Sequence, residues 1–193
     1  IYDQAVWLLA HGHGFDTVRG LGVFGNHVNL AFYLLVPFYW LGAGPNFLNL
    51  VMVAAVAASA VPVFRLGRHW LTDEWHALVP ALAFLLHFTN QWMVQETFHA
   101  EVVALFPFFM GFLAATEKRW RAYAAWMVFA VAWKEDIALA AVMVGLLFAV
   151  RGHRGDDRTM RRAGIATVVA GLGWFLLCTR LIIPAFSPGG VFY

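Results

Sequence analysis

Charged side chains are scarce in this sequence. Only 12% of its 193 residues are Asp, Glu, Lys or Arg, whereas 62% are hydrophobic. Soluble domains carry about 25% charged and about 45–50% apolar residues. So few ionic groups cannot cover a water-exposed surface, so the composition excludes an ordinary soluble domain. It predicts an integral membrane protein in contact with the lipid bilayer.

Cysteine and basic runs are also rare. The single cysteine, Cys178, lies inside an apolar run, which excludes an intrachain disulfide and a cysteine-based metal cluster. The net charge is only +2, and no basic run alternates with aromatic residues as single-strand binding requires. The sequence therefore predicts that nucleic acid is not a partner.

Long apolar runs are abundant instead. A membrane-spanning helix needs about 20 predominantly apolar residues, and six stretches are candidates for such helices. These stretches cover residues 46–64, 75–92, 102–116, 121–134, 137–150 and 163–183. The predicted fold is all-α, a polytopic transmembrane helix bundle of about six spans within a single domain over residues 1–193.

Basic residues indicate how these helices cross the membrane. Ten of the thirteen Lys and Arg residues lie in three connections, with two in 65–68, three in 118–121 and five in 151–162. Cytoplasmic loops carry an excess of Lys and Arg, so these connections are predicted to be cytoplasmic. The loops near 93–101 and 133–136, and the tail 184–193, are then external.

The first 45 residues are predicted to form one external loop ahead of the helix bundle, which covers 46–183. The apolar stretch 28–42 is short, contains Pro37 and is rich in Tyr, Trp and Phe. These features favour a helix lying in the membrane interface over a seventh span. The chain opens without an initiator Met or a signal-peptide pattern, which we interpret as a piece of a longer protein.

Acidic and histidine residues gather in the predicted external segments. Ionisable groups at membrane depth are costly and by default mark a functional site. His99 and Glu101 are candidates for binding a substrate hydroxyl or a divalent ion such as Mg²⁺ or Mn²⁺, with His27 as a third metal ligand. Asp3 is a candidate general base for an acceptor hydroxyl.

Two further candidates carry positive charge. Lys134 is suited to a phosphate and lies beside Glu135 and Asp136, either of which would hold it in place. The alternative for these three residues is a self-satisfied set of ion pairs at a tight turn. Arg180, near the external end of the last span, is either an anion partner or a side chain that reaches the interface.

Several short motifs give the sequence a resemblance to a known family. They lie at residues 1–7, 25–27, 98–101, 133–137 and 183–190. With these motifs in this order, the sequence resembles the bacterial membrane proteins of domain-of-unknown-function family 2079 from its first residue to its last. That family is similar to the GT-C glycosyltransferases, integral membrane enzymes that use polyprenyl-phosphate sugars.

The resemblance implies a bacterial plasma membrane enzyme whose active site faces the outside. It would transfer a sugar from a polyprenyl phosphate to a hydroxyl acceptor, and its essential Asp is expected just upstream of Ile1, with Asp3 as the nearest carboxylate present. The expected catalytic residues are Asp3, Glu101 and Asp136, and the expected substrate-binding residues are Lys134, Glu135, Arg180, His27 and His99. The alternatives are a transporter or permeation protein, and a non-catalytic membrane assembly subunit.

Overall fold

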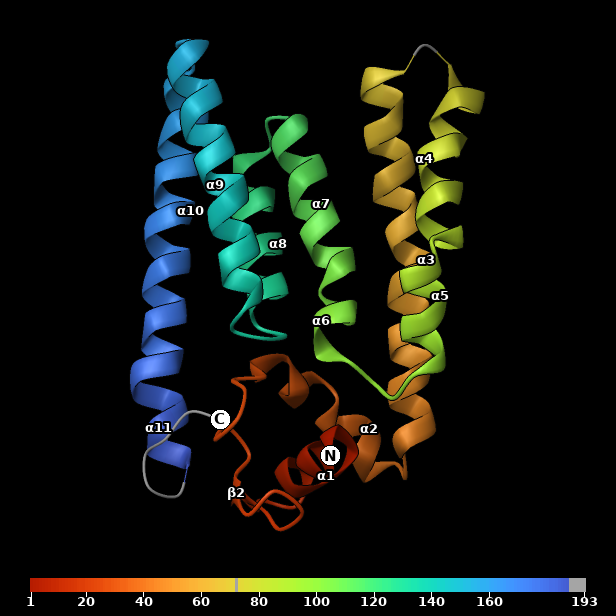
Figure 1. Ribbon diagram of the computed structural model, residues 1–193, viewed down its shortest axis with the longest axis vertical. Helices are drawn as coiled ribbons and strands as arrows, with labels where there is room; N and C mark the ends of the chain where they lie inside the picture. Colours follow the sequence, from red (N-terminus) through yellow and green to blue (C-terminus); the bar gives the residue numbers. More distant parts are fainter. Residues whose placement is uncertain (72, 188–193) are drawn as a thin grey trace. The chain divides into compact units, whose positions relative to one another are not determined.

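The computed structural model describes residues 1–71 and 73–187, which fold into two compact units. The first unit contains residues 1–41 and the chain from residue 131 onward, and the second contains residues 42–130. Helices dominate both units (Figure 1), which confirms the predicted all-α class. The predicted external tail, 184–193, lies outside the described residues from 188 onward.

The N-terminal segment of the first unit is made of short elements. They are α1 (Tyr2–Ala10), the paired strands β1 (Phe15–Asp16) and β2 (Leu21–Gly22), the 3₁₀ helix η1 (Leu30–Leu34) and α2 (Val36–Trp40). The single helix predicted over 28–42 is therefore wrong, because two short helices occupy this stretch. Pro37 lies in the first turn of α2, where its missing N–H is tolerated, whereas the interior of a longer helix would need that donor.

Two long helices complete the first unit. α9 (Ile137–Arg154) and α10 (Arg158–Leu177) lie side by side (Figure 1), and α10 continues through a π-helical turn, η2 (Cys178–Ile182), into α11 (Ile183–Phe186). The side chain of Asp157 accepts a hydrogen bond from the backbone N–H of Met160 at 2.9 Å and so caps the start of α10. The basic connection 151–162 lies at the end of this helix pair opposite to the turn that precedes α9.

Glycines allow close approach of α9 and α10. A methyl group added at Gly164 would lie 2.4 Å from the backbone nitrogen of Ala149, and one at Gly145 would lie 2.8 Å from the carbonyl oxygen of Gly164. Small residues at such crossings let helix backbones touch, which is a common way for helices to associate in membranes.

This packing predicts opposite effects for two glycine substitutions in α10. Gly164→Ala is expected to lower the free energy of unfolding by about 1–2 kcal/mol, because the backbone of Ala149 must move. Gly173 has nothing within 4 Å of an added Cβ, so Gly173→Ala is expected to raise stability slightly through its better helix propensity. Thermal unfolding in detergent micelles measures the stability of both variants. Equal shifts in melting temperature for the two variants would contradict the packing argument.

The second unit consists of helices joined by short turns. They are α3 (Pro45–Trp70), α4 (Glu74–Leu86), α5 (Phe88–Gln95), α6 (Ala100–Val103), α7 (Leu105–Thr116) and α8 (Trp120–Val131). α3 packs against α4 and α7. Asp73 caps α4 by accepting a hydrogen bond from the backbone N–H of His76 at 2.9 Å.

The number of membrane-spanning helices differs from the prediction. In the part of the chain that the structure describes, three helices are long and apolar enough to cross a membrane, namely Pro45–Trp70, Ile137–Arg154 and Arg158–Phe186. A fourth is added if α4 and α5, which are bent by 43° at their junction, count as one broken span. The prediction of six spans is therefore wrong. α7 and α8 have 12 residues each, or about 18 Å of helix, against a hydrocarbon core of about 30 Å.

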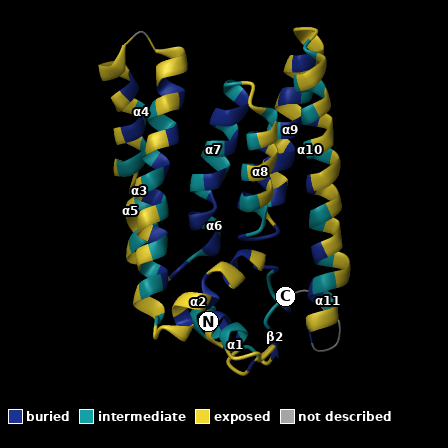
Figure 2. Cartoon of the chain, turned by 180° about the vertical axis from the view of Figure 1, so that it is seen from behind, coloured by how far each residue is buried: buried dark blue, intermediate teal, exposed yellow. Residues whose placement is uncertain are grey.

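The last long helix presents most of its apolar surface outward. Only 6% of the apolar 18-residue stretch within Arg158–Phe186 is buried inside the protein. Exposed residues run along the length of α10 (Figure 2). Val169 and Leu181, for example, are both exposed. Exposed apolar side chains on a helix of this length are suited to contact with lipid chains.

Candidate functional site

The turn that precedes α9 holds the N-terminal segment by a buried carboxylate. One oxygen of Glu135 lies 2.8 Å from Nδ1 of His27, and the other accepts a hydrogen bond from the backbone N–H of Val28 at 2.8 Å. Only 2% of the surface of Glu135 is exposed. Both carboxylate oxygens are thus used to fix two consecutive residues that lie more than 100 positions earlier in the chain.

The charge state of Glu135 decides which His27 nitrogen carries the hydrogen. Burial by itself raises the pKa of Glu135, but the hydrogen bonds from His27 and from the Val28 backbone outweigh it and hold the pKa below its ordinary value. An ionised carboxylate only accepts hydrogen bonds, so Nδ1 of His27 is the donor. In the neutral imidazole, Nε2 then carries the lone pair and is free to accept a proton.

Two further hydrogen bonds continue the attachment along the same turn. Asn29 donates its side-chain amide to the carbonyl oxygen of Trp133 at 2.6 Å. The backbone N–H of Ala31 donates to the carbonyl oxygen of Ala132 at 2.8 Å. Residues 27–31 therefore run along the turn as a continuous hydrogen-bonded edge, which fixes the His27 ring far more firmly than a free loop would.

Lys134 and Asp136 flank this carboxylate in the chain. Lys134 is buried, and its Nζ lies 3.3 Å from a carboxylate oxygen of Asp136. The side chain of Asp136 is 46% exposed, whereas that of Lys134 is 10% exposed. The turn therefore contains an ion pair of the kind that the alternative interpretation predicted, and Glu135 contacts His27.

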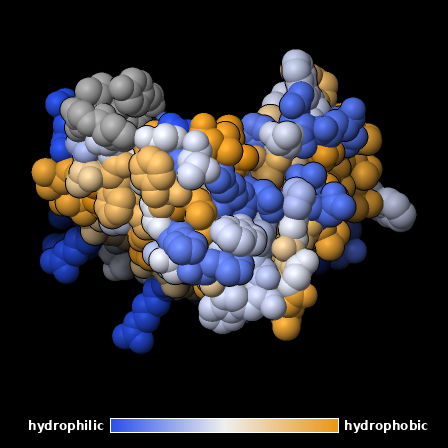
Figure 3. All heavy atoms as spheres, turned by 90° about the horizontal axis from the view of Figure 1, so that it is seen from below, coloured by the Kyte–Doolittle hydropathy of each residue, from blue (hydrophilic) through white to orange (hydrophobic). Residues whose placement is uncertain are grey.

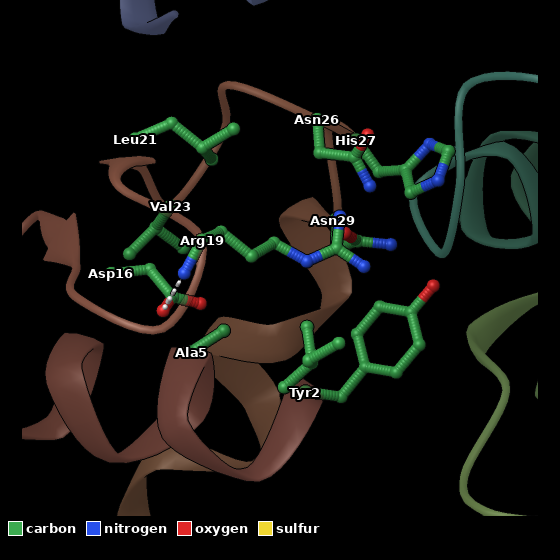
Figure 4. A pocket seen from close by; sticks show the side chains of 10 residues that line it. Tyr2, Ala5, Asp16, Arg19, Leu21, Val23, Asn26, His27 and Asn29 are labelled. Atoms are coloured by element: carbon green, nitrogen blue, oxygen red, sulfur yellow. Dashed lines mark hydrogen bonds between the residues drawn. The ribbon is translucent and has the colours of Figure 1, made fainter. Parts of the chain in front are cut away.

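A hollow opens beside His27, between α1, the hairpin and the segment that leads to η1 (Figure 4). Its empty space of about 280 Å³ includes open solvent, so the hollow is a shallow depression in the surface and not an enclosed cavity. The face drawn in Figure 3 carries both hydrophilic and hydrophobic side chains. The polar residues that line the hollow are Tyr2, Asp16, Arg19, Asn26, His27 and Asn29.

Arg19 extends across this hollow. Its side chain runs away from Asp16 and ends beside Asn29 and Tyr2 (Figure 4). The carboxylate of Asp16 instead accepts hydrogen bonds from the backbone N–H groups of Val18 and Arg19, at 2.9 and 3.2 Å, which close the hairpin turn. Among the described residues, no carboxylate lies within ion-pair distance of the Arg19 guanidinium.

A model of the family described as "Predicted membrane protein (DUF2079)" matches residues 1–191. The chain belongs to this family. The match confirms the resemblance to family 2079, whose description names a membrane protein and no activity. No curated protein and no solved structure matches the chain.

The Asp3 carboxylate of this DUF2079 chain accepts a hydrogen bond from a neighbouring helix. The hydroxyl of Tyr39 donates to a carboxylate oxygen of Asp3 at 2.6 Å. Burial, and next the hydrogen bond to Asp3, raises the pKa of Tyr39 above its ordinary value, so the hydroxyl stays protonated and remains a donor. The contact joins α1 to α2, which gives Asp3 a structural role in addition to the predicted catalytic one.

The remaining predicted site residues of the DUF2079 chain belong to other helices. Arg180 is exposed in η2 of the first unit, while His99 and Glu101 lie at the start of α6 in the second unit. The His99 ring contacts the carbonyl oxygen of Thr97, and its backbone N–H contacts the sulfur of Met52 at 3.4 Å. Within residues 1–71 and 73–187, no three His, Cys, Asp or Glu side chains are grouped to hold a metal ion.

Of the polar residues that line the hollow, only His27 was predicted as a site residue. Tyr2 belongs to an apolar helical pattern, and its hydroxyl gives no signal of its own in the sequence. Arg19 does have a signal, because it is the only Lys or Arg among residues 1–45. A lone cation in a long segment of a membrane protein that is otherwise free of basic residues is a candidate for an anion partner.

Proposed function

We propose that this protein is a membrane glycosyltransferase that moves a sugar from a polyprenyl phosphate to an acceptor hydroxyl at the external membrane face. The observation that carries the proposal is the Glu135–His27 pair, in which a buried carboxylate orients an imidazole, in a turn that also contains the buried Lys134. A carboxylate that accepts the N–H of one ring nitrogen makes the other nitrogen a better base.

In the proposed reaction, the acceptor oxygen forms a bond to the anomeric carbon of the sugar. The bond between that carbon and the phosphate oxygen breaks, and its electron pair stays with the departing polyprenyl phosphate. The acceptor proton passes to Nε2 of His27, while Glu135 holds the ring and stabilises the imidazolium that forms. Lys134 stabilises the charge that develops on the phosphate, a type of contribution that is usually large.

His27 is a better-supported base than Asp3. The Asp3 carboxylate already accepts the Tyr39 hydroxyl, whereas Nε2 of His27 is left with a lone pair by the bond at Nδ1. Arg180 is assigned a role as a second cation for the phosphate, and Asp136 holds Lys134 in place. The predicted roles of His99 and Glu101 find no counterpart in this scheme.

The arrangement of charge along α9 supports the proposed external location. The Lys134–Asp136 turn precedes its first residue, and Arg151 and Arg154 lie in its last turn. Since the basic end is favoured in the cytoplasm, the turn and the segment attached to it are favoured outside.

The test is a transfer assay on the purified full-length protein in lipid vesicles that contain polyprenyl-phosphate glucose or mannose, with release of polyprenyl phosphate as the readout. His27→Gln is expected to lower the rate by about 100-fold or more, the typical contribution of a general base. His13→Gln, an exposed histidine of the same segment, is expected to leave the rate unchanged.

Two results would contradict the proposal. One is an absence of sugar transfer by the wild-type protein with either donor. The other is a His27→Gln variant that melts at a lower temperature but transfers sugar at the wild-type rate, because that pattern assigns His27 a structural role alone.

A further inference from the structure

The hollow beside His27 contains a cation that lacks a counter-charge. Arg19 is half-buried, and among the described residues its guanidinium has no carboxylate within ion-pair distance. Asp16 does not supply that charge, because its carboxylate binds two backbone N–H groups at the other end of the Arg19 side chain (Figure 4). A cation that is partly shielded from water and has no counter-charge favours an anionic ligand, so the hollow is suited to one.

Donors and acceptors both line the hollow, but its Asp16 carboxylate already accepts two backbone N–H groups. Arginine presents five N–H groups in a planar fork, and the side chains of Tyr2 and Asn26 add a hydroxyl and an amide. Phosphate oxygens accept such bonds in pairs, and arginine favours phosphate for that reason. The guanidinium of Arg19 therefore suits a tetrahedral oxyanion better than a neutral sugar.

The other wall of the hollow is apolar. Ile1, Ala5, Leu21 and Val23 line it, and Ala5 and Leu21 are themselves buried. Free phosphate gains nothing from such a wall, whereas a phosphate ester with an apolar substituent would bury part of that substituent against it. In a membrane protein, the abundant compounds with this combination are lipid phosphates.

We propose that Arg19, together with Tyr2 and Asn26, forms a binding site for the phosphate group of a lipid phosphate. The site takes the phosphate in the hollow and the first part of the apolar chain along the Ile1–Val23 wall. This inference concerns binding alone and stands whether or not the protein transfers sugar.

The test measures binding of the full-length protein in detergent micelles to vesicles of phosphatidylcholine with and without phosphatidic acid. Arg19→Ala is expected to weaken binding to phosphatidic acid about 10–100-fold, the effect of losing charge-assisted hydrogen bonds. Arg19→Lys keeps the charge but loses the planar fork. Its affinity for phosphatidic acid is expected to lie between those of the wild type and Arg19→Ala. Arg154→Ala, an exposed arginine at the end of α9, is the matched control and is expected to bind like the wild type.

Competition with inorganic phosphate tests whether the site binds free phosphate or the phosphate of a lipid. Competition by millimolar phosphate, with loss of that competition in Arg19→Ala, supports a phosphate site, and much tighter binding of phosphatidic acid supports the lipid as its ligand. Equal binding of phosphate and of phosphatidic acid would contradict the lipid assignment. Equal loss of binding in Arg19→Ala and Arg154→Ala, or wild-type affinity in Arg19→Ala, would overturn the site. Lipid binding without sugar transfer would contradict only the function proposed above.

Discussion

Replacing Glu135 by alanine is expected to lower the free energy of unfolding by about 3–5 kcal/mol. That is the usual cost of breaking a buried pair when one partner stays behind, and here the Nδ1 hydrogen of His27 and the Val28 N–H would both lose their acceptor. For a protein of this size, such a loss corresponds to a fall of about 10 °C or more in melting temperature. Proteolysis within residues 11–20 is expected to become faster, because the N-terminal segment is less firmly attached.

The matched control is Glu74→Ala. Glu74 also forms an ion pair, with Arg68 at 3.0 Å, but its side chain is 69% exposed. Exposed pairs contribute only about 0–1 kcal/mol, so this variant is expected to melt within about 3 °C of the wild type. Similar losses in the two variants would show that the attachment by Glu135 carries no special stability.

Acid provides an independent check on the same carboxylate. Because the pKa of Glu135 is lowered in the folded protein, its contribution is complete above the ordinary glutamate pKa and is lost as the pH falls through the lower folded value. The melting temperature of the wild type is therefore expected to fall more steeply below about pH 4 than that of Glu135→Gln, which cannot titrate at this position.

Gly25→Val is expected to have the next largest effect on stability. A Cβ at Gly25 would lie 2.5 Å from the carbonyl oxygen of Phe186, so the segment and α11 would have to separate. The hydroxyl of Ser187 donates to the carbonyl oxygen of Gly25, and this bond would be lost at the same time. We expect a cost of about 3 kcal/mol, at the upper end for overpacking, because the clash is with backbone.

Gly14→Val tests whether the position matters more than the substitution. Gly14 belongs to the same segment but has nothing within 4 Å of an added Cβ, so thermal unfolding of this variant is expected to match the wild type closely. A Gly25→Val protein with the same melting temperature as Gly14→Val would contradict the close contact between residue 25 and α11.

Local patterns in the sequence predicted the long helices well. The apolar runs correspond to α3, α9 and α10, and polar residues such as Asp157 mark their ends because capping depends on neighbours in the chain. The number of spans was not predicted, because apolarity reports a preference for lipid and not the continuity of a helix. At His87 the backbone becomes extended, with ψ of 129°, and separates α4 from α5 within one apolar run.

The site was predicted by residue type but not by pairing. His27 and Glu135 both stood out as polar groups in a membrane protein, yet the sequence grouped His27 with His99 and Glu135 with its neighbours. The 108 positions between His27 and Glu135 carry no local signal of their contact, which depends on how the N-terminal segment packs against the turn before α9. Arg19 was missed although it is the only Lys or Arg among residues 1–45, because the sequence does not show the hollow that it lines.

The two oxygens of Glu135 also limit how this protein can change. One oxygen orients the His27 ring and the other anchors the backbone that carries that ring. A substitution at Glu135 therefore releases the ring and loosens its support at the same time. Selection or design that seeks to reorient this ring without loss of stability has to work through other residues around it.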